Sequence, residues 1–312
     1  MITNDIDINI VKQVVKNYLQ ADVEIERMKS GSSTYVYCVK FGTQTYYLRV
    51  LPEDISFAAE AKAHKIMLEH GINVPSPIYF EHKNSLLNKS IMLTSEIPGC
   101  PLDKGSKNKA DILIHAGKQL ALINSIGVDG FSWVDRSNFI KLTGEKRTFN
   151  DYYYDTLYSD IAFLQKYGFD IDKIKLIMDK AYPILETTDA FLVHGDFDIS
   201  HIYCTECMDE QRHTWMEFAP RATSPAGYYS GIIDFGEIRG SHYLYDLGHF
   251  KLHEDFDSFQ HLAKGYNNVK NLTADDYIKI DYLALFVGLG RGKYESYRGR
   301  IKKQLEILTY IS

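Results

Sequence analysis

The sequence is poor in cysteine and has no long apolar run. It contains four cysteines among 312 residues, scattered as Cys38, Cys100, Cys204 and Cys207. So few thiols in a chain of this length do not make the disulfide framework of a small secreted domain, and we expect them to be reduced. No stretch approaches the ~18 apolar residues of a membrane-spanning helix, and the opening MITNDIDINI lacks the basic segment and apolar core of a secretory signal. These absences predict a cytoplasmic protein.

A basic excess is also missing. The chain carries 35 lysines and arginines against 41 aspartates and glutamates, a formal net charge of −6. Nucleic acids and anionic membranes select for basic surfaces, so neither is an expected partner, whereas a cationic small molecule is compatible with this charge. The composition is that of a folded globular protein, without repeats or low-complexity tracts. Its length exceeds one ordinary core, which predicts two units.

The first third of the chain is rich in strand patterns. Apolar residues at i, i+3 and i+4 spacing predict a helix over 11–19, and β-branched and aromatic residues over 23–51 predict three antiparallel strands. A helix is expected over 55–71, ended by Gly71, followed by strands near 78–81 and 90–95. The connector EIPGCPL then predicts a boundary between an N-terminal lobe, 1–97, and a C-terminal lobe, 98–312.

Helical periodicity dominates the second lobe. It is clearest over 110–126 and from Ala274 to the C-terminus, and only 191–204 and 228–235 look like strands. A strand-rich lobe followed by a helical lobe is an α+β arrangement. We expect a monomer.

Two short motifs in the second lobe place polar residues at strand ends. HGDFDISH, residues 194–201, carries Asp196 and His201, and GIIDFG, residues 231–236, carries Asp234. If these segments converge, their oxygen and nitrogen atoms suit a divalent ion and a phosphoryl group.

The order of these motifs resembles the aminoglycoside phosphotransferase and choline kinase-like family, whose members are distant relatives of protein kinases. That family has His-Gly-Asp, a few residues and Asn, then Ile-Asp-Phe or Ile-Asp-Trp, and YDLGHF falls where it has an Asp-Leu-Ala-like segment. The resemblance covers nearly the whole chain. It implies a bilobal protein-kinase-like fold, with a small antiparallel-sheet N-lobe, a larger helical C-lobe, and Mg²⁺-dependent transfer of the γ-phosphate of ATP or GTP.

The resemblance assigns roles to the second-lobe residues. Asp196 matches the catalytic Asp that accepts or orients the proton of the substrate hydroxyl. Asp234 matches the Asp that holds Mg²⁺ against the phosphates, and its alternative is a carboxylate capping a turn. His201 stands where the family commonly has Asn as second metal ligand, and neutral imidazole can also coordinate, so a ligand role competes with a structural one. His194 is expected only to support the loop.

In the first lobe the resemblance assigns KSGSSTYVY, residues 29–37, to the loop over the nucleotide phosphates, with Ser32 or Ser33 in contact. Arg49 stands where the family commonly has a phosphate-binding Lys, and Glu60 would be its ion-pair partner. Backbone groups at Ser95 and Ile97 would bind the purine, without deciding between ATP and GTP.

Two features depart from the family pattern. Asn124 stands where the family often has His at a structural contact. The segment 204–230 is long and contains Cys204, Cys207 and His213, which together suggest three zinc ligands. Because a fourth ligand and a second paired motif are missing, an exposed hairpin insertion is the alternative.

The acceptor is expected to bind the helical lobe. Glu254, Asp255 and Asp257 could hold a polycationic aminoglycoside, which would make the protein an antibiotic-resistance enzyme, or they could form an ordinary solvated helix face. A choline-like or homoserine-like metabolite would also present a hydroxyl to Asp196. A nucleotide-binding pseudokinase is a further alternative, whereas the sequences His-Arg-Asp and Ala-Pro-Glu of protein kinases are missing.

Overall fold

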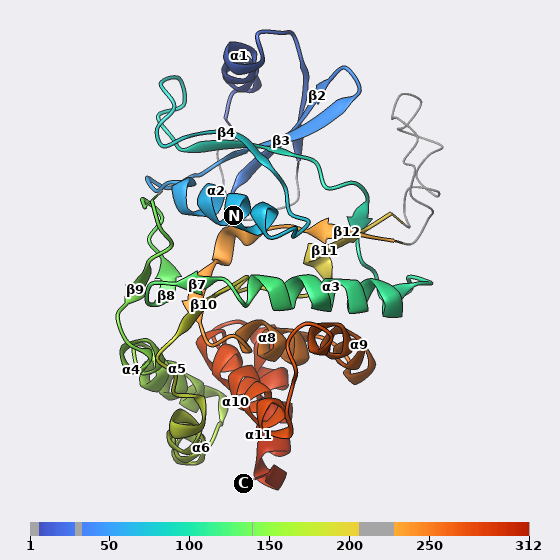
Figure 1. Ribbon diagram of the computed structural model, residues 1–312. Helices are drawn as coiled ribbons and strands as arrows, with labels where there is room; N and C mark the ends of the chain where they lie inside the picture. Colours follow the sequence, from blue (N-terminus) through green and yellow to red (C-terminus); the bar gives the residue numbers. More distant parts are fainter. Residues whose placement is uncertain (1–5, 29–32, 139, 206–227, 312) are drawn as a thin grey trace. The chain divides into compact units, whose positions relative to one another are not determined.

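The computed structural model describes residues 6–28, 33–138, 140–205 and 228–311. The N-terminal region is built on an antiparallel sheet and the C-terminal region is mainly helical (Figure 1), which confirms the predicted α+β class. Two compact units make up the chain. The first takes Met1–Cys100, Asp135–Leu142 and Tyr203–Ile233, and the second takes Pro101–Val134, Thr143–Ile202 and Asp234–Ser312.

The first unit contains the helices and strands that the apolar periodicity predicts. Its five-stranded antiparallel sheet has the order β1-β2-β3-β5-β4. The elements are α1 (Ile8–Leu19), β1 (Glu24–Met28), β2 (Tyr35–Phe41), β3 (Gln44–Val50), α2 (Ala58–Glu69), β4 (Pro77–Glu81) and β5 (Ile91–Ser95).

Both faces of this sheet are covered. Alternate residues of β2, β3 and β5 pack against α1 in one buried cluster, because successive side chains of a strand point to opposite faces. The cluster contains Val11, Val14, Val15, Tyr35, Tyr37, Val39, Leu48, Val50, Ile91 and Leu93. Met92 packs instead with Phe57 and Ala61, at and within the start of α2. Gly71 follows α2 with φ +72°, as its position in the sequence predicts.

The second unit combines helices with a small sheet of order β7-β10-β13-β8-β9. Its helices are α3 (Lys109–Ile123), α4 (Phe149–Tyr153), α5 (Leu157–Leu164), η1 (Gln165–Tyr167), α6 (Ile171–Leu185), η2 (Ile199–His201), η4 (Phe235–Glu237), α8 (Tyr245–His253), α9 (Phe256–Asn267), α10 (Ala274–Gly290) and α11 (Glu295–Ile311). Its strands are β7 (Gly127–Val128), β8 (Phe131–Val134), β9 (Gly144–Lys146), β10 (Ala190–Val193) and β13 (Arg239–Ser241). A further sheet has the order β12-β11-β6, with β6 (Cys100–Pro101), β11 (Ile202–Cys204) and β12 (Tyr229–Ile232).

Three sequence expectations need correction. Strands β7, β8, β9 and β13 were not predicted, because strands of two to four residues are too short to show alternation. The helical stretch predicted from Ala274 to the C-terminus is two helices, α10 and α11, and the break falls at Arg291, which lies between two glycines. The expectation of reduced thiols is wrong for Cys100, which is disulfide-bonded, whereas Cys38 is free.

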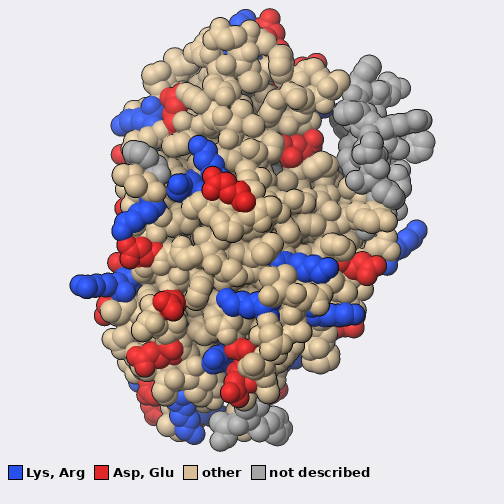
Figure 2. Space-filling view, viewed as in Figure 1, with Lys and Arg blue, Asp and Glu red and all other residues tan. Residues whose placement is uncertain are grey.

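The surface is mixed in charge. On the face drawn in Figure 2, basic and acidic side chains are interspersed. Among the described residues, no helix combines the length and hydropathy needed to cross a bilayer.

Helices α3 and α9 approach each other closely at two glycines. A Cβ on Gly117 of α3 would lie 2.1 Å from the carbonyl oxygen of Leu262, and one on Gly265 of α9 would lie 2.0 Å from that of Ile114. Since neither oxygen belongs to a flexible side chain, any larger residue would force the helices apart. This packing holds the end of α3, from which Asn124 reaches the site described below.

We expect Gly117→Ala to lower the free energy of unfolding by about 2 kcal/mol, because an added methyl group overpacks the helix contact. Gly299→Ala in α11 is the matched control, since its Cβ would meet nothing within 4 Å. The control should be neutral or stabilising by up to about 1 kcal/mol, because alanine favours a helix more than glycine does. Urea unfolding measures both values, and equal stabilities would contradict the close-packing argument.

Candidate active site

The loop after β10 carries the first motif and begins with a backbone position that requires glycine. Gly195 has φ +85°, and a Cβ there would lie 2.1 Å from the carbonyl oxygen of Glu237. The loop therefore combines a left-handed conformation with a close approach to the chain after Asp234. This accounts for the glycine between His194 and Asp196.

The buried carboxylate of Asp246 holds the same loop by hydrogen bonds to its backbone. Asp246 in α8 is completely buried and accepts hydrogen bonds from the backbone N–H groups of His194 (2.8 Å) and Gly195 (3.0 Å). The side-chain amide of Asn124 donates to Asp246 at 2.9 Å and to the carbonyl oxygen of Leu192 at 3.0 Å. Asn124, a departure from the family pattern, thus makes a structural contact of its own.

The Asp196 carboxylate receives two basic side chains on one oxygen. Arg291 Nη1 donates to Oδ1, and His249 Nε2 lies 3.2 Å from the same atom. Burial raises the pKa of the Asp196 carboxyl, but the close approach of His249 and the positive charge of Arg291 outweigh it and hold that pKa well below its usual range. Asp196 is therefore ionised at neutral pH. Among the described residues, no hydrogen bond or ion pair reaches Oδ2.

His201 is oriented by its own loop. Asp198 caps η2 by accepting the backbone N–H of Ser200 at 2.8 Å, which places His201 at the end of one tight turn. His201 Nδ1 lies 2.7 Å from the carbonyl oxygen of Asp196. A carbonyl can only accept, so Nδ1 carries the hydrogen and Nε2 keeps its lone pair.

Asp234 completes the pair of candidate metal ligands. Its Oδ2 lies 3.7 Å from His201 Nε2, and its side chain is 52% exposed. Asp234 has φ +64°, a left-handed conformation that is uncommon for residues other than glycine and is enriched at functional sites. A ligand imidazole characteristically donates its second nitrogen to a carbonyl, as His201 does. The Asp234 carboxylate is the type of ligand that Mg²⁺ prefers, since this ion is commonly held by one or two carboxylates together with phosphates and water. Imidazole nitrogen is a less usual ligand for Mg²⁺, and the described residues hold no group of three His, Cys, Asp or Glu side chains that could hold a metal ion.

The candidate nucleotide residues lie in the first unit. Arg49 of β3 forms an ion pair with Glu60 of α2, whose side chain is completely buried. His64 Nε2 lies 3.8 Å from the same carboxylate. Ser33 is exposed two residues before β2, and Ser32 lies outside the described residues. The expected ion pair is present, whereas phosphate binding by Arg49 stays a prediction.

The hinge candidates lie at the end of β5. Ser95 exchanges hydrogen bonds with Ser76, since its N–H donates to Ser76 O and its Oγ accepts from Ser76 N, both at 2.9 Å. Ile97 lies against Gly231, where an added Cβ would come within 3.0 Å of Ile97 Cγ2. Cys207 and His213, the other members of the suggested zinc set, lie outside the described residues.

The acidic acceptor candidates lie in different surroundings. Asp255 accepts the backbone N–H of Ser258 at 2.7 Å and so caps α9. Asp257 is 88% exposed beside His261. Burial raises the pKa of the Glu254 carboxyl, which lies close to the backbone of Ile199. Glu254 is therefore the member of the set that reaches the HGDFDISH loop.

Sequence reasoning missed three residues of this site. Asp246 and His249 lie in YDLGHF, which was noted only as a family segment, and nothing local marked either as a partner of Asp196. Arg291 stands 95 residues away from Asp196 in the chain, between two glycines. The Gly-Arg-Gly interruption of a helical pattern was the available signal.

We expect Asp246→Ala to lower the free energy of unfolding by about 3 kcal/mol or more, because it leaves three buried donors without an acceptor. Asp189→Ala, at an exposed aspartate just before β10, is the control and should change stability by less than about 0.5 kcal/mol. Chemical denaturation with both variants measures the difference. A loss at Asp246 no larger than at Asp189 would show that the loop is held by other contacts.

Several solved structures are similar to this chain. A thermostable mutant of aminoglycoside phosphotransferase APH(4)-Ia is 13% identical, with 95% of this chain and 98% of that chain covered and a TM-score of 0.64. A candidate fructosamine-3-kinase from Thermobifida fusca YX-ER1 is 14% identical, with 96% of this chain and 98% of that chain covered and a TM-score of 0.65. Macrolide 2'-phosphotransferase MphH from Brachybacterium faecium is 11% identical, with 97% of each chain covered and a TM-score of 0.60. Identities this low show the fold alone, which is protein-kinase-like as the motifs predict.

Sequence comparison adds the family. The search of curated proteins gave no match. The family model described as phosphotransferase enzyme family matches residues 24–213, more than half of the chain and including the whole HGDFDISH loop. The protein therefore belongs to the phosphotransferase enzyme family.

Proposed function

We propose that this phosphotransferase moves the γ-phosphate of ATP or GTP to a hydroxyl group of an aminoglycoside-type small molecule. The observation that carries the proposal is the state of Asp196. Its carboxylate is ionised, partly exposed and engaged through Oδ1 alone among the described residues. An ionised carboxylate with one open oxygen can accept a hydrogen bond from an attacking hydroxyl and orient it, and it takes up the proton as the new bond to phosphorus makes that proton acidic.

The proposed reaction is an in-line displacement at phosphorus. The acceptor oxygen forms a bond to the γ-phosphorus, the bond from that phosphorus to the bridging oxygen breaks, and the nucleoside diphosphate leaves. The proton of the acceptor hydroxyl passes to Oδ2 of Asp196 and from there to solvent. Rigid placement of this carboxylate by the loop contacts reduces the reorganisation that the reaction would otherwise require.

Mg²⁺ would be held by His201 Nε2 and Asp234 Oδ2. When bound, it would supply positive charge to the donor phosphates. The support from this chain is the tautomer of His201, whose Nδ1 hydrogen bonds to Asp196 O and leaves Nε2 directed at Asp234. The same hydrogen bond links the metal-binding candidate to the backbone of the base.

The donor nucleotide is proposed to bind residues of the first unit. Arg49, oriented by Glu60, would contact the phosphates, and Ser32 and Ser33 would contribute hydroxyls and backbone amides. Backbone groups at Ser95 and Ile97 would meet the purine. One similar structure, of an APH(4)-Ia mutant, is a ternary complex with ADP and hygromycin B, which supports a nucleotide donor and a small-molecule acceptor.

An aminoglycoside acceptor is favoured by charge. Glu254 lies beside the HGDFDISH loop, and Asp255 and Asp257 follow it at the start of α9. Ammonium groups of a polycationic sugar would pair with these carboxylates while a hydroxyl faces Asp196. Such a reaction would inactivate an antibiotic.

The proposal predicts transfer of labelled γ-phosphate from ATP or GTP to at least one member of a panel of aminoglycosides, hygromycin B, macrolides, amino sugars and choline. Asp196→Asn should fold normally and lose transfer by about 100-fold or more, because the amide keeps the shape but cannot take the proton. Asp189→Asn is the surface control. Product formation by Asp196→Asn within tenfold of wild type, at equal thermal stability, would remove Asp196 as the base.

The metal assignment predicts a graded dependence on Mg²⁺. His201→Ala and Asp234→Ala should both need about tenfold more Mg²⁺ for half-maximal transfer, since each loses one ligand. His201→Asn, which restores an oxygen donor, should need less than His201→Ala. The rate is measured over a Mg²⁺ titration for each variant, and wild-type titration curves for both alanine variants would leave these residues as structural.

A further inference from the structure

The turn between α10 and α11 brings the guanidinium of Arg291 to the loop that carries Asp196. Arg291 follows Gly290, and its side chain is only 18% exposed. Nη1 donates to Asp196 Oδ1, and Nη2 donates to the carbonyl oxygen of Gly195 at 2.8 Å. The planar guanidinium thus bonds the backbone of Gly195 and the side chain of Asp196 at the same time. The ammonium group of a lysine cannot make this pair of bonds.

The guanidinium is itself held by neighbours on α11 and α8. Arg291 Nη1 also donates to the Tyr297 hydroxyl at 3.0 Å, and that hydroxyl lies 2.7 Å from His253 Nε2. His253 Nδ1 lies 2.8 Å from the carbonyl oxygen of His249. The tyrosine hydroxyl therefore accepts from Arg291 and donates to His253, which restricts the rotamer of both partners.

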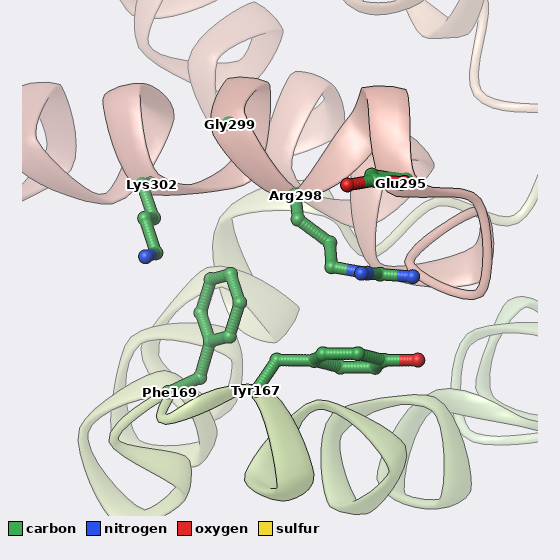
Figure 3. A pocket seen from close by; sticks show the side chains of 6 residues that line it. All are labelled: Tyr167, Phe169, Glu295, Arg298, Gly299 and Lys302. Carbon is green, nitrogen blue, oxygen red and sulfur yellow. The ribbon is translucent and has the colours of Figure 1, made fainter.

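The turn is also braced from its outer side. Arg298 Nε donates to the carbonyl oxygen of Gly292 at 3.3 Å, and its guanidinium lies 3.6 Å from the centre of the Tyr167 ring (Figure 3). Tyr167 and Arg298 line a pocket of about 290 Å³, with Lys302 at its other end. These contacts hold the turn that carries Arg291.

We propose that Arg291 is a positioning residue for phosphoryl transfer, holding the Asp196 carboxylate by Oδ1 so that Oδ2 faces the acceptor hydroxyl. This inference rests on the proposed function. A carboxylate held by one oxygen cannot rotate to exchange its two oxygens without breaking the bond to Arg291. His249 Nε2 approaches the same Oδ1 from α8. Arg291 acts through Asp196, so its loss affects turnover more than nucleotide binding.

The test compares Arg291→Met, which keeps much of the side-chain volume, with Lys302→Met, which removes one charge from the same helix hairpin. Initial rates are measured for transfer to the best acceptor of the panel and for release of phosphate from ATP to water, which needs no identified acceptor. We expect Arg291→Met to lower kcat by about tenfold or more, with KM for ATP within about twofold. Lys302→Met should match wild type in both.

Two further variants separate positioning from folding. Arg291→Lys keeps the charge but cannot bond both Asp196 and Gly195, so its kcat should lie between those of wild type and Arg291→Met. Arg291→Ala opens the guanidinium site, and guanidinium ion at a concentration that leaves the wild type unaffected should raise its kcat by about threefold or more. A role confined to stability predicts no such rescue.

Wild-type kcat in Arg291→Met, or absence of guanidinium rescue in folded Arg291→Ala, would overturn the inference. A rise in the KM for the acceptor that is larger than the fall in kcat would also overturn it, since Arg291 would then bind substrate directly. If wild type neither transfers phosphate nor hydrolyses ATP, the proposed function itself fails. If the wild type is active and Arg291→Met is equally active, the role of Arg291 is wrong and the proposed function still stands.

Discussion

The buried carboxylate of Asp246 is the contact on which the arrangement of the second unit's site depends. An ion enclosed in protein is costly unless it is hydrogen-bonded, and Asp246 meets this requirement with two backbone N–H groups and the amide of Asn124. Those two N–H groups belong to His194 and Gly195, immediately before Asp196. The need to satisfy one buried charge therefore fixes the backbone that carries the reacting group, and it connects α8, β10 and the end of α3.

A second constraint acts on the side chain of Asp196. Desolvation alone would favour its protonated form, but the fixed charge of Arg291 and the approach of His249 favour the anion. As the folded pKa is depressed, this charge stabilises the fold at neutral pH, and the contribution is lost as pH falls through the folded value. The same interactions keep the carboxylate charged, so that it can accept a hydrogen bond from the acceptor hydroxyl and orient it.

The parts predicted from the sequence are those with a local pattern. Tyr35, Tyr37 and Val39 alternate along one strand, and the spacing in HGDFDISH and GIIDFG marks Asp196 and Asp234 before any contact is known. Arg49 and Glu60, placed by family resemblance, do form an ion pair, and their part in nucleotide binding stays a prediction. Arg291 carries no comparable pattern, because its contact joins residues 95 positions apart and depends on how two helices pack. Strands such as β7, two residues long, exist only through their neighbours in the sheet.

The central claim is that Asp196 is the reacting group and that the surrounding charges act through it. A double-mutant cycle of Asp196→Asn and Arg291→Met, read as initial rates of ATP-dependent phosphoryl transfer, tests this directly. The account predicts that Arg291→Met slows the wild-type enzyme but adds no further loss in the Asp196→Asn background. If the fold-losses in rate of the two single variants multiply in the double variant, the account is contradicted, because Arg291 would then contribute to the reaction independently of Asp196.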